Sequence, residues 1–270
     1  MIPAYEQELI LSHILKKSRE YVLTHPEMRL NKKQKQLLHK MSARRLKNEP
    51  LAHILGHKEF YGLDFKVTRH TLIPRPETEL LVEEIIKLRP KNSTIIDVGT
   101  GSGNIIISLC KNIKNKNNYY GIDISEKALR VAKYNTRKHG VDKKIIFIKG
   151  DLLKPFILNS KFEIRNFIIV ANLPYLSNKI YNSAKPDVKN FEPKIALSGG
   201  DNGLDYYKKL FKQIKTLKEN CFMFHVLCYM EISPEQKLKL EKMVQKYFPG
   251  SKLAFQKDLA RKWRIASFSI

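Results

Sequence analysis

The chain has 270 residues, of which 43% are hydrophobic, and its 50 Lys and Arg against 26 Asp and Glu give a formal net charge of +24. This length and apolar content exclude a disulfide-stapled miniprotein, a collagen-like chain and a wholly disordered tail. The positive charge favours polyanions such as RNA or ribosomes, because each neutralised phosphate releases counterions. A genome rich in Lys codons would produce the same excess, so the charge alone identifies no substrate.

No apolar stretch approaches the ~20 residues that a membrane-spanning helix needs, and the N-terminus carries Glu6 and Glu8 where a signal peptide would be basic. We therefore expect a cytoplasmic protein without membrane contact. Three cysteines, Cys110, Cys221 and Cys228, lack C-x-x-C spacing. We accordingly expect neither a disulfide framework nor a metal site.

The first 46 residues have the apolar spacing of helices. Apolar side chains recur at helical intervals between Ile10 and Val22 and predict one amphipathic helix there. Asn31 is a candidate N-cap for a second helix, which ends at Leu46 before the helix-stopping sequence Asn-Glu-Pro. Both helices belong to a small N-terminal unit.

A different pattern connects this unit to the rest of the chain. Apolar and other side chains alternate over residues 60–67 and predict an extended segment, and residues 71–76 form a connector bounded by proline. We therefore predict that residues 1–75 form a helical domain with an extended linker.

From Leu80 onward, short β-branched runs alternate with helical patterns. The predicted strands cover 94–98, 119–124, 145–148, 167–171 and 221–231, with two more near residues 253 and 265. The predicted helices cover 80–88, 104–111, 126–139, 206–217 and 234–247. Such alternation is typical of an α/β fold with a mostly parallel sheet and helices on both faces. We predict one domain over residues 76–270, with its ligands at the carboxyl ends of the strands.

A glycine-rich loop follows the first strand of this domain and precedes a helix. Its glycines allow a sharp turn and a close approach to a ligand, and the helix that follows offers unpaired N–H groups. The alternatives are a structural turn and a dinucleotide site, although the latter usually has the spacing G-x-G-x-x-G. The residues that we predict to bind a small polar cofactor here are Gly99, Thr100, Gly101, Ser102 and Gly103.

Acidic residues end the next two strands. Asp123 lies twenty positions beyond the loop, where a carboxylate can accept hydrogen bonds from ribose hydroxyls, so a nucleoside-containing ligand is indicated. A helix cap is the alternative role for Asp123. Asp151 follows the third strand near the expected adenine position, and Leu152 can cover one face of the ring.

The tetrad Asn172-Leu173-Pro174-Tyr175 ends the fourth strand and looks like the N-P-P-Y tetrad of methyltransferases that use S-adenosylmethionine to modify planar NH₂ groups. The nitrogen of an amide attacks poorly because its lone pair is delocalised. Two acceptors, the Asn172 side-chain oxygen and the Leu173 carbonyl, can hold both N–H bonds and orient the nitrogen toward the methyl group. Pro174 stiffens the turn and Tyr175 offers a flat apolar wall.

These four residues are predicted to bind the substrate, with Asn172, Pro174 and Tyr175 as the catalytic set and Asn172 also beside the cofactor. A loop tetrapeptide of this composition without function is the alternative. Its position, one series of strands and helices after the glycine loop, favours the functional interpretation.

With these residues identified, the chain resembles the HemK-type (PrmC) protein-glutamine methyltransferases. The resemblance implies a class I methyltransferase (Rossmann-like) fold, with S-adenosyl-L-methionine as cofactor. It also implies methylation of the glutamine amide nitrogen in the Gly-Gly-Gln motif of peptide-chain release factors. By the same resemblance, the connector packs over the methyl-donor pocket and the N-terminal helical domain docks the release factor. The segments that carry the resemblance to the family are 49–56, 59–63, 72–79 with Pro-Arg-Pro-Glu-Thr-Glu, the glycine loop, the tetrad, 192–197 and 199–204.

Two positions depart from the family pattern. Leu173 replaces the usual proline of the tetrad, and Leu152 replaces the aromatic residue over the adenine. Asn-Leu-Pro-Tyr also resembles the tetrad of ribosomal RNA adenine dimethyltransferases, so an RNA adenine-N6 methyltransferase is the alternative. Those enzymes lack the Pro-Arg-Pro-Glu-Thr-Glu segment. A non-catalytic RNA-binding protein on a decayed scaffold is a third hypothesis, and the intact tetrad and glycine loop oppose it. We expect a monomer whose charge brings it near RNA or the ribosome.

Overall fold

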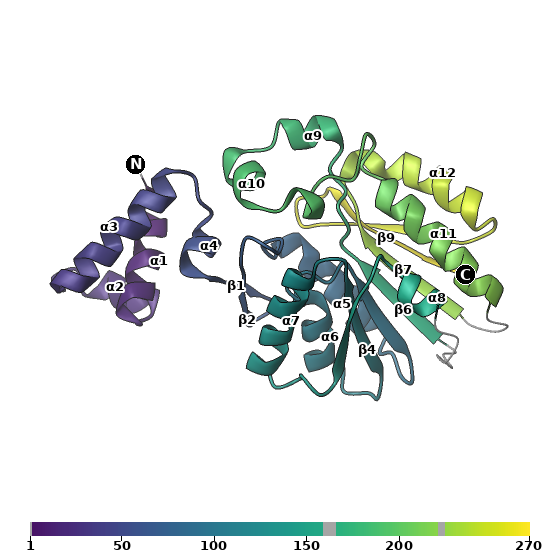
Figure 1. Ribbon diagram of the computed structural model, residues 1–270, viewed down its shortest axis with the longest axis horizontal. Coiled ribbons are helices and arrows are strands. Elements are labelled where there is room, and N and C mark those ends of the chain that lie inside the picture. Colours follow the sequence, from purple (N-terminus) through teal and green to yellow (C-terminus); the bar gives the residue numbers. More distant parts are fainter. Residues whose placement is uncertain (1, 159–165, 221–224) are drawn as a thin grey trace.

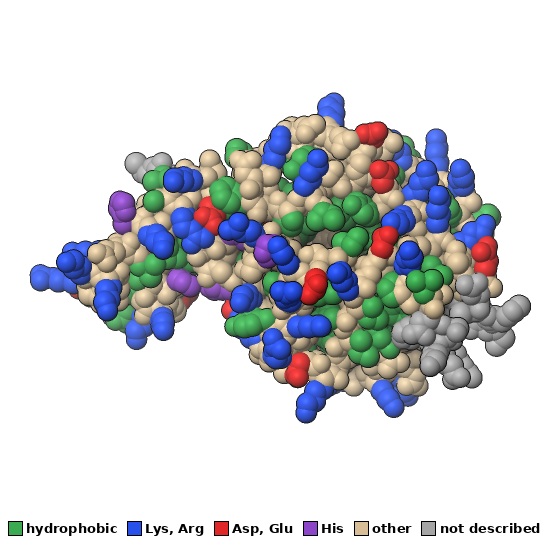
Figure 2. Space-filling model, in the orientation of Figure 1, with side chains coloured by type: hydrophobic (Ala, Val, Ile, Leu, Met, Phe, Trp, Pro, Cys, Tyr) green, Lys and Arg blue, Asp and Glu red, His purple; other side chains and the backbone are tan. Residues whose placement is uncertain are grey.

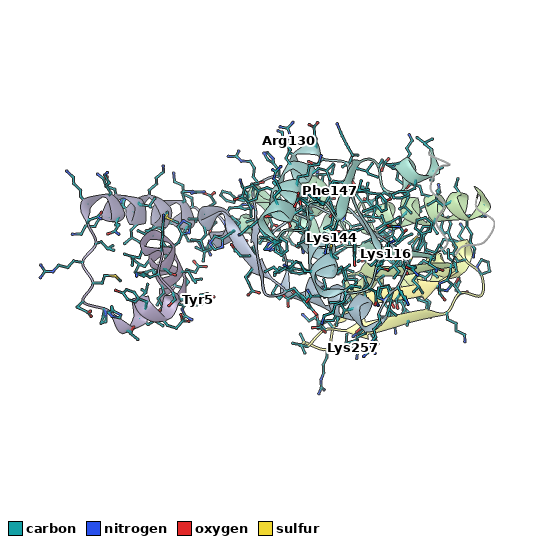
Figure 3. All side chains as sticks on the ribbon, turned by 90° about the horizontal axis from the view of Figure 1, so that it is seen from below. Tyr5, Lys116, Arg130, Lys144, Phe147 and Lys257 are labelled. Carbon is teal, nitrogen blue, oxygen red and sulfur yellow. The ribbon has the colours of Figure 1, made fainter. Side chains whose placement is uncertain are left out.

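The computed structural model describes residues 2–158, 166–220 and 225–270. A group of N-terminal helices stands apart from a larger domain built on a sheet (Figure 1). The view from below separates the same two parts, with Tyr5 among the N-terminal helices and Arg130 and Lys257 on opposite sides of the sheet domain (Figure 3). Figure 2 shows Lys and Arg side chains over both parts on one face of the molecule.

The N-terminal helices are α1 (Ala4–Leu15), α2 (Arg19–Thr24), α3 (Lys32–Leu46) and α4 (Leu51–Leu55). Ile10, Met41 and Ile54 form their small core. Asn31 caps α3 as predicted, because its side chain accepts from the backbone of Gln34 and the Gln34 side chain accepts from Asn31. This unit has a hydrophobic core of its own.

The prediction of a single helix between Ile10 and Val22 was wrong. The chain leaves α1 at Lys16, which takes the left-handed conformation with φ 54°, and Ser18 then caps α2 by accepting from the backbone of Tyr21. Left-handed backbone ends a helix, because it turns the following N–H groups back toward the last carbonyls.

The predicted extended segment over 60–67 is in fact part of a hairpin. Strands β1 (His57–Phe60) and β2 (Leu63–Lys66) pair antiparallel. Tyr61 and Gly62 between them both have positive φ, at 51° and 69°. Two consecutive residues with positive φ form a tight turn whose twist matches that of paired antiparallel strands. The alternation of apolar side chains did not indicate this turn.

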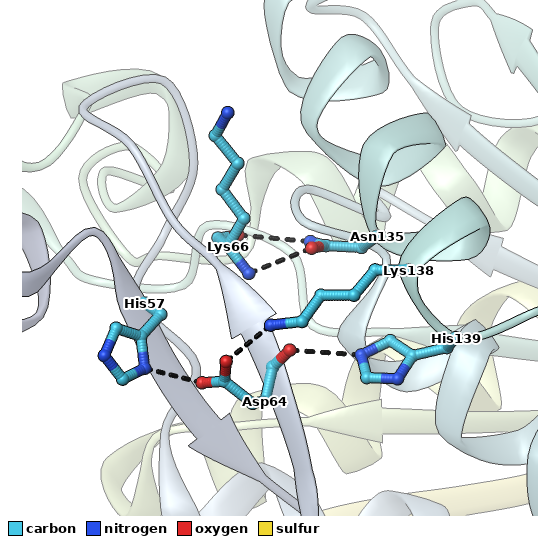
Figure 4. A network of polar contacts seen from close by, with 6 residues as sticks. All are labelled: His57, Asp64, Lys66, Asn135, Lys138 and His139. Atoms are coloured by element: carbon cyan, nitrogen blue, oxygen red, sulfur yellow. Dashed lines mark hydrogen bonds and ion pairs between the residues drawn. The ribbon is translucent and has the colours of Figure 1, made fainter. Parts of the chain in front are cut away.

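The hairpin is fixed to α7 (Glu126–Lys138) by polar contacts (Figure 4). The Asp64 carboxylate forms an ion pair with Lys138 and lies 2.6 Å from Nδ1 of His57. The Asn135 side chain bonds to both backbone groups of Lys66, accepting at 2.9 Å and donating at 3.1 Å. The hairpin therefore links the N-terminal helices to the sheet domain.

The sheet domain has seven strands in the order β5-β4-β3-β6-β7-β9-β8. They are β3 (Thr94–Val98), β4 (Asn118–Asp123), β5 (Ile145–Lys149), β6 (Asn166–Ala171), β7 (His225–Glu231), β8 (Leu253–Lys257) and β9 (Trp263–Ser269). The first five in this order are parallel, and β8 and β9 are antiparallel additions at one edge. The predicted α/β fold with a mostly parallel sheet is confirmed. Residues 221–224 of the predicted fifth strand lie outside the described residues.

Helices cover both faces of this sheet (Figure 1). The helices of this domain besides α7 are η1 (Pro76–Thr78), α5 (Glu79–Lys87), α6 (Asn104–Asn112), α8 (Lys154–Ile157), α9 (Asn178–Asn182), α10 (Pro186–Phe191), α11 (Asp205–Asn220) and α12 (Lys237–Tyr247), with single 3₁₀ turns at Lys194–Ala196 and Pro234–Gln236. Of these, α9 and α10 belong to the segment between β6 and α11. The short helices α4, α8, α9 and α10 were not predicted. Along the described parts of the chain, none of the helices is long and apolar enough to cross a bilayer.

Strand β6 shows how the sequence builds the two layers. Phe167, Ile169 and Ala171 pack with α11 and α12, whereas Ile168 and Val170 pack with α5 and α6. Both faces of the strand are apolar because both are covered. The chain runs from β3 outward to β5 and then crosses back to β6 beside β3. Ligands in such sheets bind at this crossing, beyond the carboxyl ends of the strands.

Candidate active site

A pocket lies at this crossing, beyond the ends of β3, β4 and β6. Most of the residues predicted to bind the cofactor or substrate line it: Gly99, Thr100, Gly101, Ser102, Asp123, Asp151, Leu152, Asn172, Leu173 and Pro174. Tyr175 lines an adjoining pocket, which also reaches Asn172 and Arg75. Gly103 lies behind the pocket as the N-cap of α6, where a Cβ would meet Ala132 at 3.2 Å.

The glycine loop folds back over the end of β4. The backbone N–H groups of Gly99 and Thr100 both donate to the carbonyl of Ile122, at 2.8 and 2.9 Å. Gly99 has φ 76°, and a Cβ there would come within 3.0 Å of Cδ2 of Leu173. Glycine at this position therefore allows both the turn and the close packing of the loop against the tetrad.

Asp123 ties the glycine loop to α7. One carboxylate oxygen accepts from the N–H of Gly101 at 2.9 Å, and the other accepts from the N–H of Ser125 at 2.8 Å. Burial raises the pKa of this carboxyl, while these two backbone hydrogen bonds lower it. Each oxygen has a second lone pair, so the group can still accept from hydroxyls of a ligand.

The lining of the pocket suits S-adenosylmethionine. The glycines let a ligand come close to the loop backbone, although the N–H groups of Gly99, Thr100 and Gly101 are bonded within the protein. The Asp123 carboxylate suits a ribose. Leu152 is 7% exposed and offers an apolar surface to a base. Asp151 also lines the pocket, and its carboxylate forms an ion pair with Lys209 of α11.

The tetrad sits in a network of buried hydrogen bonds. The Asn172 amide nitrogen donates to the Thr78 hydroxyl at 3.0 Å, and Thr78 donates to the carboxylate of Glu231 at 2.6 Å. The other oxygen of Glu231 accepts from the Tyr175 hydroxyl at 2.9 Å. Both ends of the tetrad are thus attached to one carboxylate at the end of β7.

Backbone contacts hold the second half of the tetrad. The Gln236 side chain donates to the carbonyl of Tyr175 at 2.8 Å. A Cβ at Gly199 would lie 2.3 Å from the carbonyl oxygen of Pro174, and a Cβ at Gly203 would lie 2.0 Å from that of Tyr175. Only glycine can occupy these two positions without moving the tetrad.

The connector forms another wall of the pocket, as the resemblance implied. Thr71, Leu72, Pro74 and Arg75 line it together with Thr78. The connector is therefore part of the site rather than a simple spacer.

Neither Thr78 nor Glu231 was among the residues predicted to form the site. Thr78 lies within the Pro-Arg-Pro-Glu-Thr-Glu segment, and Glu231 is an acidic residue at the carboxyl end of a mostly apolar strand. That position in a parallel sheet was the available signal, because such strand ends meet at the ligand site.

Comparisons with known proteins agree with this geometry. A family model described as "Methyltransferase domain" matches residues 90–247, and one described as "PrmC N-terminal domain" matches residues 2–56. Among solved structures, the hMettl16 catalytic domain in complex with MAT2A 3′UTR hairpin 1 has a TM-score of 0.62 at 12% identity, covering 96% of this chain and 90% of that chain. At such low identity this likeness shows the fold alone.

Similar sequences share one name. The release factor glutamine methyltransferase of Buchnera aphidicola is 36% identical over 251 residues, covering 91% of this chain and 84% of that protein. The protein of the same name from Bacillus cereus is 30% identical over 264 residues, covering 96% and 89%. The chain therefore belongs to the family of S-adenosylmethionine-dependent release factor glutamine methyltransferases.

Proposed function

We propose that this chain transfers a methyl group from S-adenosylmethionine to the glutamine side-chain nitrogen in the Gly-Gly-Gln motif of peptide-chain release factors. The observation that carries the proposal is the hydrogen bond from the Asn172 amide nitrogen to Thr78. Because this bond occupies the donor end of the Asn172 amide, the oxygen is the end left for a substrate N–H. The names of the relatives support the same substrate.

The tetrad orients the reacting nitrogen. The Asn172 side-chain oxygen and the Leu173 carbonyl each accept one N–H of the glutamine amide, so its nitrogen faces the methyl group along the line of attack. Pro174 restricts the turn between these two acceptors and Tyr175. The flat Tyr175 ring limits the positions that the substrate side chain can take. The nitrogen loses its proton after the attack, so no strong base is needed in the site.

The loop and strand ends hold the cofactor. Gly99, Thr100, Gly101 and Ser102 face its amino acid end, and Asp123 accepts from its ribose hydroxyls. When bound, S-adenosylmethionine supplies an electrophilic methyl group, whose bond to sulfur breaks as the bond to nitrogen forms. Asp151 and Leu152 line the place of the adenine base.

The N-terminal helices dock the protein substrate in this proposal, and residues 1–75 act as the docking unit with its linker. The exposed basic side chains of α3 support an electrostatic contact with an acidic surface. A release factor substrate places the reaction in the cytoplasm, near ribosomes and their RNA. The chain carries all of the proposed site residues itself, so we propose that it works as a monomer.

The test supplies labelled S-adenosylmethionine together with one of three acceptors: a release factor, the same factor with its motif glutamine changed to glutamate, or ribosomal RNA. We expect label on the motif glutamine of the first acceptor alone, located by mass spectrometry of its peptides. Glutamate is the matched control because it keeps the shape of glutamine without the NH₂ group. Label on RNA adenine instead of the release factor would overturn the proposal.

A further inference from the structure

Glu231 is a buried carboxylate, 1% exposed, for which the transfer step described above has no use. It accepts from Thr78 through one oxygen and from Tyr175 through the other. We propose that Glu231 is a positioning residue that determines which end of the Asn172 side-chain amide faces the substrate. The inference rests on the proposed function, in which the oxygen of that amide receives a substrate N–H.

The proposal follows from counting protons along the chain of hydrogen bonds. An ionised carboxylate can only accept, so the hydroxyls of Thr78 and Tyr175 must both donate to Glu231. The single hydroxyl proton of Thr78 is then used, and its oxygen faces Asn172 with lone pairs alone. Only the NH₂ end of Asn172 can bond to it, which is the arrangement present in the structure.

A neutral Glu231 would remove this constraint. Its acidic proton could be donated to the oxygen of Thr78, and the Thr78 proton could then point at Asn172. The amide would be free to turn over and bond through its oxygen, and the NH₂ end would face the substrate. Two NH₂ groups cannot form the required hydrogen bond, so the glutamine nitrogen would lose one of its two acceptors.

Charged and polar groups from several elements surround this carboxylate. Burial raises its pKa, and the hydrogen bonds from Thr78 and Tyr175 lower it. Arg264 of β9, which also pairs with Asp258, lowers the pKa of Glu231, and Glu77 of η1 raises it.

The Tyr207 hydroxyl donates to the backbone carbonyl of Glu231, so it places the residue without binding its carboxylate. The pKa of Glu231 lies above that of an ordinary Glu, so the neutral form gains population at a higher pH than for a solvated side chain. The methylation rate should therefore fall as pH decreases through this raised pKa.

The test compares Glu231→Gln, Thr78→Val and Thr78→Ser with the unmodified enzyme. Initial rates of release factor methylation give kcat and KM from pH 5 to 9, and calorimetry gives the Kd for S-adenosylmethionine. We expect kcat of Glu231→Gln and Thr78→Val to fall by about 10–100-fold, with cofactor Kd changed less than about threefold. Thr78→Ser should recover most of the rate, because it restores the hydroxyl alone.

The pH profile separates positioning from simple support of the fold. We expect the decline of kcat at low pH to disappear in Glu231→Gln, since a side-chain amide does not titrate there. Glu241→Gln is the charge-matched control, because Glu241 is exposed on α12 and away from the pocket. It should keep both the rate and the profile.

The outcomes distinguish the two proposals. If Asn172→Ala remains active, the proposed role of the tetrad fails. If Asn172→Ala is inactive while Glu231→Gln keeps the normal kcat and pH profile, only the positioning role of Glu231 fails. If Glu231→Gln does not fold, the two Thr78 variants test the positioning role instead. Equal methylation rates for Thr78→Val and Thr78→Ser would then overturn it.

Discussion

The carboxylate of Glu192 accepts a hydrogen bond from the backbone N–H of Ile73 at 2.9 Å, although 119 positions separate the two residues. The same carboxylate, 1% exposed, forms an ion pair with Arg75. It thereby joins the connector before α5 to the loop after α10, and both segments line the pocket. Two of the segments that carry the family resemblance, 72–79 and 192–197, are thus bound to one another beside the site.

Asn172 should be required for a fast methyl transfer but not for folding. Changing it to Ala removes one of two acceptors that orient the substrate nitrogen, so the methylation rate should drop by about 10²–10³-fold. Cofactor binding and folding should persist, because the side chain contributes one hydrogen bond to the surrounding network. Rate assays, calorimetry with S-adenosylmethionine and circular dichroism of the same preparation check this. An active Asn172→Ala enzyme would contradict the mechanism.

Asp123 should determine the affinity for the cofactor. Asp123→Ala removes charge-assisted hydrogen bonds worth roughly 1.5–3 kcal/mol, so the Kd should rise tenfold or more. The loss also frees the N–H groups of Gly101 and Ser125, so the glycine loop loses a restraint. Asp142→Ala is the charge-matched control on an exposed turn, and it should bind normally. Calorimetry giving the same Kd for both variants would exclude the ribose role.

Leu173 differs from the usual proline of the tetrad, and the structure specifies what proline would change. Burial raises the pKa of the Tyr207 hydroxyl, and a hydrogen bond with the backbone of Leu173 lowers it. Proline lacks the N–H that forms this bond but keeps the carbonyl that the substrate needs. Leu173→Pro should therefore retain activity within a few fold while the free energy of unfolding falls by about 1 kcal/mol. Loss of activity in a folded variant would be inconsistent with a carbonyl-only role.

The longer strands and helices of the sheet domain could be predicted because each has a clear apolar period and a cap or turn at its ends. Ser125, for example, directly precedes the predicted helix 126–139 and caps α7 by accepting from the backbone N–H of Ala128. The break between α1 and α2 at Lys16 could not be predicted, because the apolar spacing continues through it and the left-handed residue is not a glycine. Helices α9 and α10 have five and six residues, which is too short for a period to be recognised.

The site was predictable where a strand end carries its own motif. The glycine loop and Asn172 each follow a predicted strand, and the parallel order of β3 and β6 brings them together. The contact of Thr78 with Glu231 spans 153 positions and depends on how η1 packs beside the end of β7. No local pattern encodes such a pair, so the network around the tetrad required the structure.

Asp97 should give the apoprotein an unusual pH dependence of stability. Burial raises the pKa of this carboxyl to about 7, although Thr100 donates to it and lowers the pKa. The folded state thus holds the proton more strongly than the unfolded chain. The resulting stabilisation is complete below about pH 4 and is lost as pH rises through 7, by up to about 4 kcal/mol.

Asp97→Asn provides the comparison, because its side chain has the same shape and does not titrate. As pH rises from 4 to 8, the free energy of unfolding of Asp97→Asn should increase relative to that of the unmodified protein. Urea titrations at several pH values without cofactor measure it. A difference that stays constant over this range would show that Asp97 has an ordinary pKa.

Exposed lysines of α3 should contribute to the binding of the protein substrate. Arg44 and Arg45 form ion pairs with Glu49 and Glu6 inside the N-terminal unit, so the exposed lysines are the better test of docking. If Lys32, Lys33 and Lys35 meet an acidic surface of the substrate, KM should rise steeply with salt. The Debye length shrinks from ~10 Å at 0.1 M to ~3 Å at 1 M, which screens such a contact.

A matched pair of triple variants shows which exposed lysines determine KM and its salt dependence. Changing the three α3 lysines to Gln should raise KM at low salt and flatten its salt dependence. Changing three exposed lysines of α11 removes the same charge from the sheet domain and should leave KM close to that of the unmodified enzyme; these are Lys208, Lys212 and Lys215. Because both variants lower the net charge by three, any difference between them reports position rather than total charge. Equal KM values for the two triples, or a KM insensitive to salt in the unmodified enzyme, would show that the lysines of α3 only interact with solvent.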